Sequence, residues 1–292
     1  MSTPRLRRVG VGDVAGLRRR AVDPAALVVA SAIVERVRAG GFQAAVDEGI
    51  RLGDLSPGEP VIHDPAACRG ALESLPLPQQ ELLARTAERI AAFARGQRMT
   101  QGDLTVVIPG GRAGHEVAPV LAAGCYAPGG RFPLPSSVLM TAVTARMAGV
   151  GSVWVASPRP AAVTLAAAAV AGADGLLALG GAQAIALLAL GGGPVPRCDV
   201  VAGPGNAYVT AAKLLVSGDT GVDMLAGPSE LVVVADGSAS PEVVALDLLA
   251  QAEHDPDALP VLVTWEPAVA DAVDAAIADA LPGLPTAVTA GA

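Results

Sequence analysis

Hydrophobic and polar positions follow a helical spacing in the first part of the chain. Residues 23–40 (DPAALVVASAIVERVRAG) predict a helix capped by Asp23 and ended by glycine, and residues 79–95 predict a second amphipathic helix. Between them, residues 52–78 are rich in Pro, Gly and Asp and predict a loop region with little regular structure.

From about Gly124 the pattern changes, because short β-branched runs alternate with Ala-rich runs and Gly or Pro separates them. Strands followed by helices of about ten residues indicate βαβ units and a parallel sheet with right-handed crossovers. We therefore expect an α/β protein of the doubly wound kind, with ligands at the carboxyl ends of its strands. The predicted strands are 152–157, 175–180, 198–203, 230–236 and 259–265, and the predicted helices are 160–173, 182–190, 207–218, 241–254 and 267–281.

Composition narrows the class of protein. About half of the 292 residues are apolar (52%) and 16% are charged, which excludes a disordered chain. Aromatic residues make up only 2%, so a platform that stacks bases is disfavoured, and the net charge of −8 gives no basic field for nucleic acid. Three cysteines without a CxxC pair indicate neither a disulfide framework nor a cysteine-rich zinc site, and they favour the cytoplasm.

One uncharged stretch, residues 175–193, has the length of a membrane span. It is mostly Gly and Ala, carries Gln183 near its middle and lacks flanking basic or aromatic anchors. A buried strand, loop and helix is therefore expected, with no membrane contact. The basic N-terminus also lacks the apolar run of a secretory signal.

Four Gly- and Pro-rich loops lie at residues 126–130, 180–183, 203–206 and 227–230. Glycines allow a ligand to approach the backbone, and free N–H groups at a helix start suit a phosphate or carboxylate. The alternative for each loop is a tight turn in a closely packed domain. Each loop also carries one polar side chain that could reach a ligand: Tyr126, Gln183, Asn206 and Ser229. Ser136 is expected to cap the helix that follows the first loop.

The common nucleotide and hydrolase motifs are missing. There is no GxxxxGK[ST], HExxH or GxSxG, and a GxGxxA match at residues 10–15 lies outside any βαβ unit, so we interpret it as coincidence. Gln251 and His254, three residues apart, share one helix face and could bind a metal together. Spacing alone also allows a surface histidine stabilised by the helix dipole.

Taken in order, these segments resemble histidinol dehydrogenases. The resemblance rests on YAPGGRFPLPSSVLMTAVTARMAGV, GGAQAIALLAL, VAGPGNAYVTAAKLLVSGDTGVDMLAGPSELVVVAD and LLAQAEHDPDALPVLVT, and it covers roughly residues 20–265. It implies oxidation of L-histidinol to L-histidine through the aldehyde, the last step of histidine biosynthesis, with two NAD and a bound zinc. It also implies a homodimer with sites completed across the subunit interface.

The resemblance assigns roles to six residues. Nucleotide contacts fall on Tyr126, Gln183 and Asn206, substrate contacts on Ser229, Gln251 and His254, and two zinc ligands on Gln251 and His254. It also implies two incomplete doubly wound, Rossmann-like domains with parallel sheets. Residues 126–229 would form a nucleotide-side domain inserted into an outer domain of residues 1–125 plus 230–292, which carries the zinc-side motif.

Members of this family continue beyond the point that matches residue 292. The continuing part supplies an adjacent Glu-His pair for acid–base catalysis and two further zinc ligands, so no catalytic residue is carried over here. Candidate bases are His115 (expected in a surface loop), Glu230, Glu253 and Asp255. Two alternatives stay open: a truncated, non-catalytic NAD-binding paralogue or fragment, or a related zinc and NAD dehydrogenase for another small amino- or hydroxy-alcohol.

Overall fold

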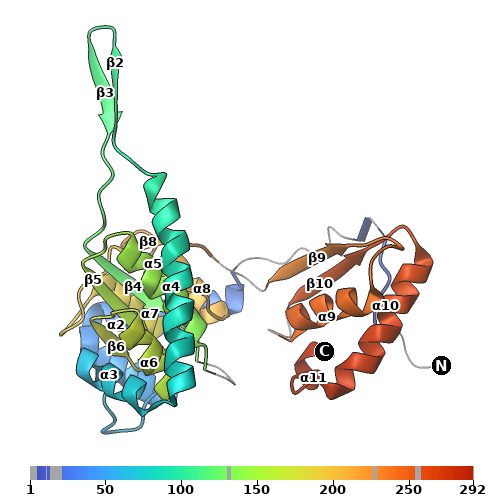
Figure 1. Ribbon diagram of the computed structural model, residues 1–292. Coiled ribbons are helices and arrows are strands. Elements are labelled where there is room, and N and C mark those ends of the chain that lie inside the picture. The colour runs from blue at the N-terminus through green and yellow to red at the C-terminus, as the bar shows by residue number, and fades with distance from the viewer. Residues whose placement is uncertain are drawn as a thin grey trace. The chain divides into compact units, whose positions relative to one another are not determined.

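The computed structural model describes residues 5–10, 12–13, 22–129, 133–225, 229–253 and 258–291. These divide into two compact units (Figure 1). We call residues 22–225 the sheet unit, and the described parts of residues 1–21 and 226–292 the terminal unit. Residues 22–125, which the resemblance assigned to the outer domain, pack here with the segment that follows them.

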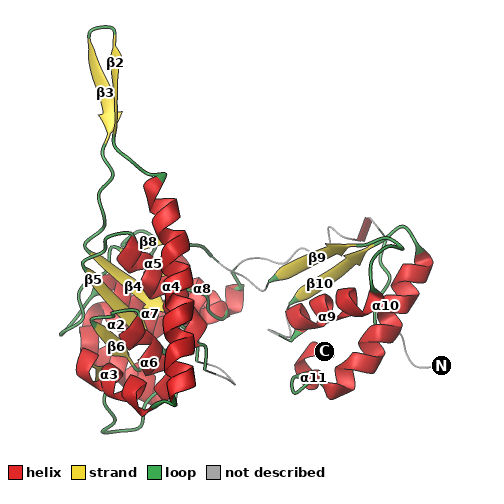
Figure 2. Cartoon of the chain, in the orientation of Figure 1, coloured by secondary structure: helices red, strands yellow, loops and turns green. Residues whose placement is uncertain are grey.

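The sheet unit is built on six strands in the order β1-β6-β5-β4-β7-β8; Figure 2 labels β4, β5, β6 and β8 among them. All neighbours pair in parallel except β1, which is antiparallel to β6. After the edge strand β1, the chain enters the centre of the sheet at β4, continues outward through β5 and β6, and returns to the other side of β4 for β7 and β8. This reversal makes the sheet doubly wound and confirms the predicted α/β class. The strands are β1 (Ile62–His63), β4 (Ala122–Tyr126), β5 (Ser152–Ala156), β6 (Gly175–Leu177), β7 (Val200–Ala202) and β8 (Gly221–Val222).

Helices cover both faces of this sheet. One layer consists of α3 (Pro65–Ser74), α4 (Leu77–Met99), α5 (Pro135–Met147) and α6 (Ala162–Val170), and the other of α2 (Pro24–Arg51), α7 (Gly181–Leu190) and α8 (Ala207–Val216). Side chains of β4 alternate between the two layers: Ala122 and Tyr126 join the α2–α7–α8 core, and Ala123 and Cys125 join the opposite one. Small residues let helix α7 pack closely on the sheet, since a Cβ at Gly124 of β4 would lie 3.0 Å from the Leu188 side chain.

The uncharged stretch folds as expected from its composition. Residues 175–193 contain β6 and α7, and every residue of α7 from Ala182 to Ala189 is buried. Within the described ranges, no helix combines the length and apolarity that a bilayer crossing requires.

Three local predictions differ from the structure. Asp23 caps α2 by accepting the Ala25 N–H, but the helix continues past the expected glycine stop, through a kink at Gly41 (φ 60°), as far as Arg51. The predicted loop at 52–78 contains β1 and α3, because Asp64 and Pro65 form a helix start that the surrounding prolines obscured. The proposed Ser136 cap is wrong as well, since α5 begins at Pro135 and no side chain caps it.

A hairpin of β2 (Leu104–Ile108) and β3 (Gly111–His115) was not predicted from the sequence. Its strands pair antiparallel with each other, join no other described strand, and are exposed throughout. His115 therefore lies on a strand and not in a loop, exposed as expected, with its Nε2 3.1 Å from the Gly102 carbonyl oxygen.

The described part of the terminal unit is a βαβ unit followed by two further α-helices. Its strands β9 (Glu230–Val234) and β10 (Leu259–Val263) pair in parallel, and α9 (Pro241–Ala252), α10 (Pro267–Ala280) and α11 (Ala287–Ala290) accompany them, with a 3-10 turn at Leu281–Gly283. Its core includes Leu248, Val273 and Ile277. The N-terminal segment belongs to this unit because the Arg5 and Leu6 N–H groups donate to Asp274 Oδ1, at 2.7 and 2.6 Å.

The three thiols are predicted to be inert in the native protein. All are buried, and burial raises the pKa of Cys68 to about 11 and the pKa values of Cys125 and Cys198 to about 12. Because the thiolate is the nucleophile, we expect no reaction with a chromogenic disulfide reagent at pH 8 and reaction of three thiols per chain in urea. Rapid labelling of the native chain would contradict this expectation.

Candidate functional site

The loops singled out in the sheet unit lie at the carboxyl edge of its sheet. Tyr126 ends β4, residues 180–183 lead from β6 into α7, and residues 203–206 lead from β7 into α8. The strand order reverses between β4 and β7, and in doubly wound sheets such a switch point is where ligands bind. The structure therefore brings Tyr126, Gln183 and Asn206 to one edge of one sheet.

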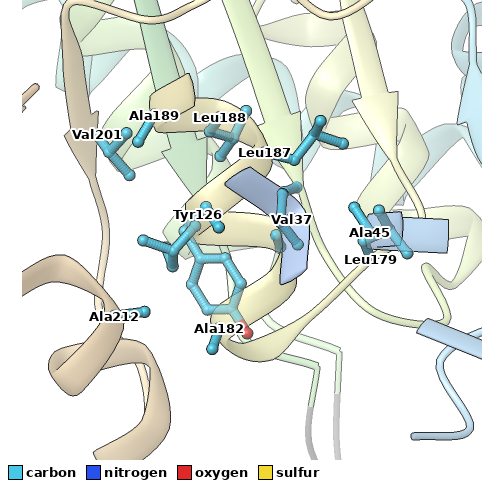
Figure 3. Close-up of a cluster of buried hydrophobic side chains, with 14 of the residues drawn as sticks. Val37, Ala45, Tyr126, Leu179, Ala182, Leu187, Leu188, Ala189, Val201 and Ala212 are labelled. Atoms are coloured by element: carbon cyan, nitrogen blue, oxygen red, sulfur yellow. The ribbon is translucent and has the colours of Figure 1, made fainter. Parts of the chain in front are cut away.

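Tyr126 connects two of these loops. Its side chain is only 3% exposed and lies among Val37, Leu188 and neighbouring apolar residues (Figure 3). Its hydroxyl oxygen accepts the Gly181 N–H at the start of α7, at 3.1 Å. Burial raises the pKa of Tyr126 to about 12, so the phenol stays neutral and supplies a hydroxyl rather than a charge.

Gln183 is held by a carboxylate from a distant part of the sequence. Its Nε2 donates to Asp54 Oδ2 at 2.7 Å, and the same oxygen accepts the Gly180 N–H at 2.8 Å. Gln183 is 1% exposed, yet its Oε1 has no hydrogen-bond partner among the described residues. A buried amide oxygen without a partner is costly, so this atom marks a position where a ligand's donor would be favourable.

The glycines of both loops stand where side chains would not fit. A Cβ at Gly180 would lie 2.7 Å from Pro158, and Gly181 has a φ of 59°. Gly203 has a φ of 130°, and a Cβ there would overlap the carbonyl oxygen of Tyr126. These glycines are therefore needed for the close approach of backbone segments around the strand ends.

Asn206 caps α8 and is exposed. Its Oδ1 accepts the N–H groups of Tyr208 and Val209, both at 3.1 Å, so its Nδ2 amide is the part left to contact a ligand.

An ion pair between a buried lysine and a partly exposed aspartate supports the loop that carries Asn206. Lys213 of α8 is 2% exposed, and its ammonium group donates to Asp223 Oδ1 at 2.5 Å and to the carbonyl of Gly203. Asp223 Oδ2 in turn accepts the Gly203 N–H at 2.8 Å. Both backbone polar groups of Gly203 are thus fixed by one pair of side chains.

Sequence reasoning missed Asp54, Lys213 and Asp223. For Lys213 a signal was present, because it is the only lysine of the chain and it interrupts an apolar helix. A lone charge at such a position is typical of a buried pair. Asp54 gave no comparable signal, since 129 residues separate it from Gln183.

A small cavity of about 140 Å³ opens beside these loops, between the segments that follow β4 and β5. It is lined by Pro128, Gly129, Ser157, Pro158 and Arg159, among others. Arg159 is exposed and has a φ of 45°, a left-handed conformation that non-glycine residues rarely adopt. Within the described residues, this edge of the sheet therefore carries a concave surface at which Arg159 supplies a cationic side chain.

The remaining predicted residues belong to the terminal unit. Ser229 is exposed and its carbonyl accepts the Leu259 N–H at 3.0 Å, directly before β9. Gln251 lies in the last turn of α9 with a buried Nε2 that has no partner among the described residues, and Glu253 accepts the Thr286 hydroxyl at 2.8 Å. His254 and Asp255 lie outside the described residues.

Of the two implied zinc ligands, Gln251 lies among the described residues. The Gln251 side chain fits a ligand position, because its buried nitrogen has no partner among the described residues and the amide oxygen and nitrogen can exchange places by rotation. It is a single donor, however, whereas structural and catalytic zinc ions take about three or four protein ligands. Over the described part of the chain, no three His, Cys, Asp or Glu side chains gather as a metal-ligand group.

Comparisons with known proteins agree on one family. The family model described as histidinol dehydrogenase matches residues 17–292. The chain is 47% identical to histidinol dehydrogenase of Thermus thermophilus over 269 residues and 45% identical to that of Methylococcus capsulatus over 218 residues. These matches cover 91% and 73% of this chain, but 63% and 50% of the relatives. A crystal structure of histidinol dehydrogenase from Elizabethkingia anophelis is similar with a TM-score of 0.87 and 25% identity, covering 100% of this chain and 69% of that one.

Proposed function

Because the chain belongs to the histidinol dehydrogenase family, we propose that it serves the NAD-dependent oxidation of L-histidinol to L-histidine in histidine biosynthesis. The chain spans about half to two-thirds of the length of the two curated relatives named above, so the reaction, the substrate and the partners are all part of this proposal. We also propose a homodimer in the cytoplasm, as the family implies.

Tyr126, Gln183 and Asn206 are proposed to bind NAD at the carboxyl edge of the sheet. The observation that carries this assignment is the buried Oε1 of Gln183, which has no hydrogen-bond partner among the described residues and lies in a glycine-lined turn at the start of α7. The neutral Tyr126 hydroxyl and the Nδ2 amide of Asn206 add polar groups without charge. Bound there, NAD would supply the hydride acceptor, and the chain's own residues would orient it.

Ser229, Gln251 and His254 are proposed to contact the substrate, and Gln251 and His254 to contribute to a zinc site. The buried Nε2 of Gln251, which has no hydrogen-bond partner among the described residues, supports this proposal. A zinc ion bound there would orient the amino, imidazole and alcohol groups of the substrate. No residue of this chain is assigned as the acid–base catalyst.

The proposal is tested by titrating the purified chain with NAD in a calorimeter, and by following NADH formation after L-histidinol and zinc are added. We expect saturable NAD binding and NADH formation. L-Histidine serves as the control substrate because it lacks the alcohol, and it should give no NADH. Absence of NAD binding would contradict the proposed site, and NAD binding without NADH formation would contradict the proposed oxidation.

A further inference from the structure

The side-chain amide of Gln183 has a fixed polarity, because a carboxylate can accept but not donate a hydrogen bond. With Asp54 Oδ2 2.7 Å away, the NH2 group must face Asp54 and the carbonyl oxygen must face the other way. A flipped amide would place two acceptors against each other at that distance. Oε1 is consequently the atom of Gln183 that is turned toward the start of α7, about 3.0 Å from where a Cβ of Gly181 would stand.

Asp54 itself is held rigidly by the end of α2. The helix closes with Gly53 at a φ of 80°, and the Asp54 N–H donates to the Gly49 carbonyl at 2.8 Å. This six-to-one bond after a left-handed glycine is the Schellman arrangement of helix ends. The backbone of Asp54 is therefore fixed before any ligand binds, and its carboxylate holds two groups of the α7 turn at once.

We propose that Asp54 is a positioning residue, which fixes the Gln183 amide so that Oε1 accepts a hydrogen bond from the bound dinucleotide. This inference rests on the proposed function and specifies its chemistry. The part of the ligand that meets Oε1 is an N–H or O–H donor: a ribose hydroxyl, the adenine amino group or the nicotinamide carboxamide. A phosphate is excluded at this point, because its oxygens would face an amide oxygen backed by a carboxylate.

The inference predicts a specific pattern of NAD dissociation constants, measured by calorimetry on the full chain. Q183M should weaken binding about tenfold, and D54L should weaken it about as much, since one net hydrogen bond is worth up to a factor of about ten. D54N should stay within about twofold of the wild type, because the Asn Oδ1 can accept the same two donors. In the Q183M background, D54L should cause no further loss of affinity.

A purely structural role for Asp54 would give a different result. D64A is the matched control, because Asp64 caps α3 through the Ala67 N–H, at 2.7 Å, in the same unit. It should lower the melting temperature yet leave the NAD dissociation constant unchanged. If D54L weakens NAD binding equally with and without Gln183, Asp54 does not act through Gln183 and the proposal is overturned. If D54L does not fold, Q183M and D54N still test the proposal. An NAD dissociation constant of Q183M equal to that of the wild type, or a loss of more than about twofold in D54N, would overturn it.

NAD analogues identify which donor meets Oε1. The hypoxanthine analogue lacks the adenine amino group, the acetylpyridine analogue lacks the carboxamide NH2, and deoxyribose analogues lack single hydroxyls. The analogue without the relevant donor should bind about tenfold more weakly to the wild type, with no such difference for Q183M. If no analogue shows a loss that depends on Gln183, the oxygen meets no ligand donor and the proposal fails. If the wild type does not bind NAD at all, the proposed function fails instead.

Discussion

Replacing Gly203 by alanine is expected to destabilise the sheet unit by more than about 3 kcal/mol. The φ of 130° is unfavourable for an L-residue by about 1–3 kcal/mol. The added Cβ would also overlap the Tyr126 carbonyl oxygen and lie 2.8 Å from its carbon, in backbone that is part of the central strand. The loop cannot move away freely, because Asp223 accepts the Gly203 N–H and Lys213 donates to the Gly203 carbonyl.

The free energy of unfolding is measured by urea denaturation followed by tryptophan fluorescence. The chain has two tryptophans, and Trp154 lies on β5 while Trp265 belongs to the terminal unit, so a Trp265→Phe background isolates the sheet unit. Gly218→Ala is the matched control, because a Cβ there meets nothing within 4 Å, and we expect a change within about 0.5 kcal/mol. Equal stabilities of the two alanine variants would contradict the reading of Gly203 as a packing glycine.

Local sequence patterns were sufficient to predict the repeating part of the fold. The β5, α6 and α7 segments are short runs of β-branched or Ala-rich residues separated by Gly or Pro, so each element could be identified from its own residues. The α3 helix was missed because prolines and glycines surround it, although its Asp64-Pro65 start is a recognisable signal in hindsight. The β2–β3 hairpin was missed because its apolar strand residues are exposed in the structure, which a burial-based pattern does not anticipate.

The candidate site was predictable in its loops but not in its supports. Tyr126, Gln183 and Asn206 follow strand ends, and parallel strands bring such positions to one edge. The link from Asp54 to Gln183 depends on how α2 ends and where it packs on α7, and neither is encoded near Gln183. The same holds for Asp223, whose carboxylate joins Gly203 and Lys213 only after β8 has paired with β7.

Replacing Lys213 by methionine is expected to cost about 2–4 kcal/mol of sheet-unit stability, although the apolar stem is retained. Loss of the ammonium leaves the Gly203 carbonyl and one oxygen of Asp223 without their donor. Breaking a fully buried ion pair costs about 3–5 kcal/mol, and the Asp223 side chain is 33% exposed, so water offsets part of that cost. Arginine should not restore stability, because its larger planar group does not fit a position that is 2% exposed.

The ion pair of Arg85 with Glu81 on α4 gives the matched control for Lys213. These side chains are 61% and 56% exposed, so Arg85→Met should change stability by less than about 1 kcal/mol in the same urea assay. The double variant K213M/D223N should be more stable than K213M, since asparagine leaves no uncompensated charge and keeps an acceptor for the Gly203 N–H. If K213M instead matches Arg85→Met, Lys213 does not anchor the loop. The geometry of Gly203 would then have to come from the β7–β8 pairing and the packing against Tyr126 alone.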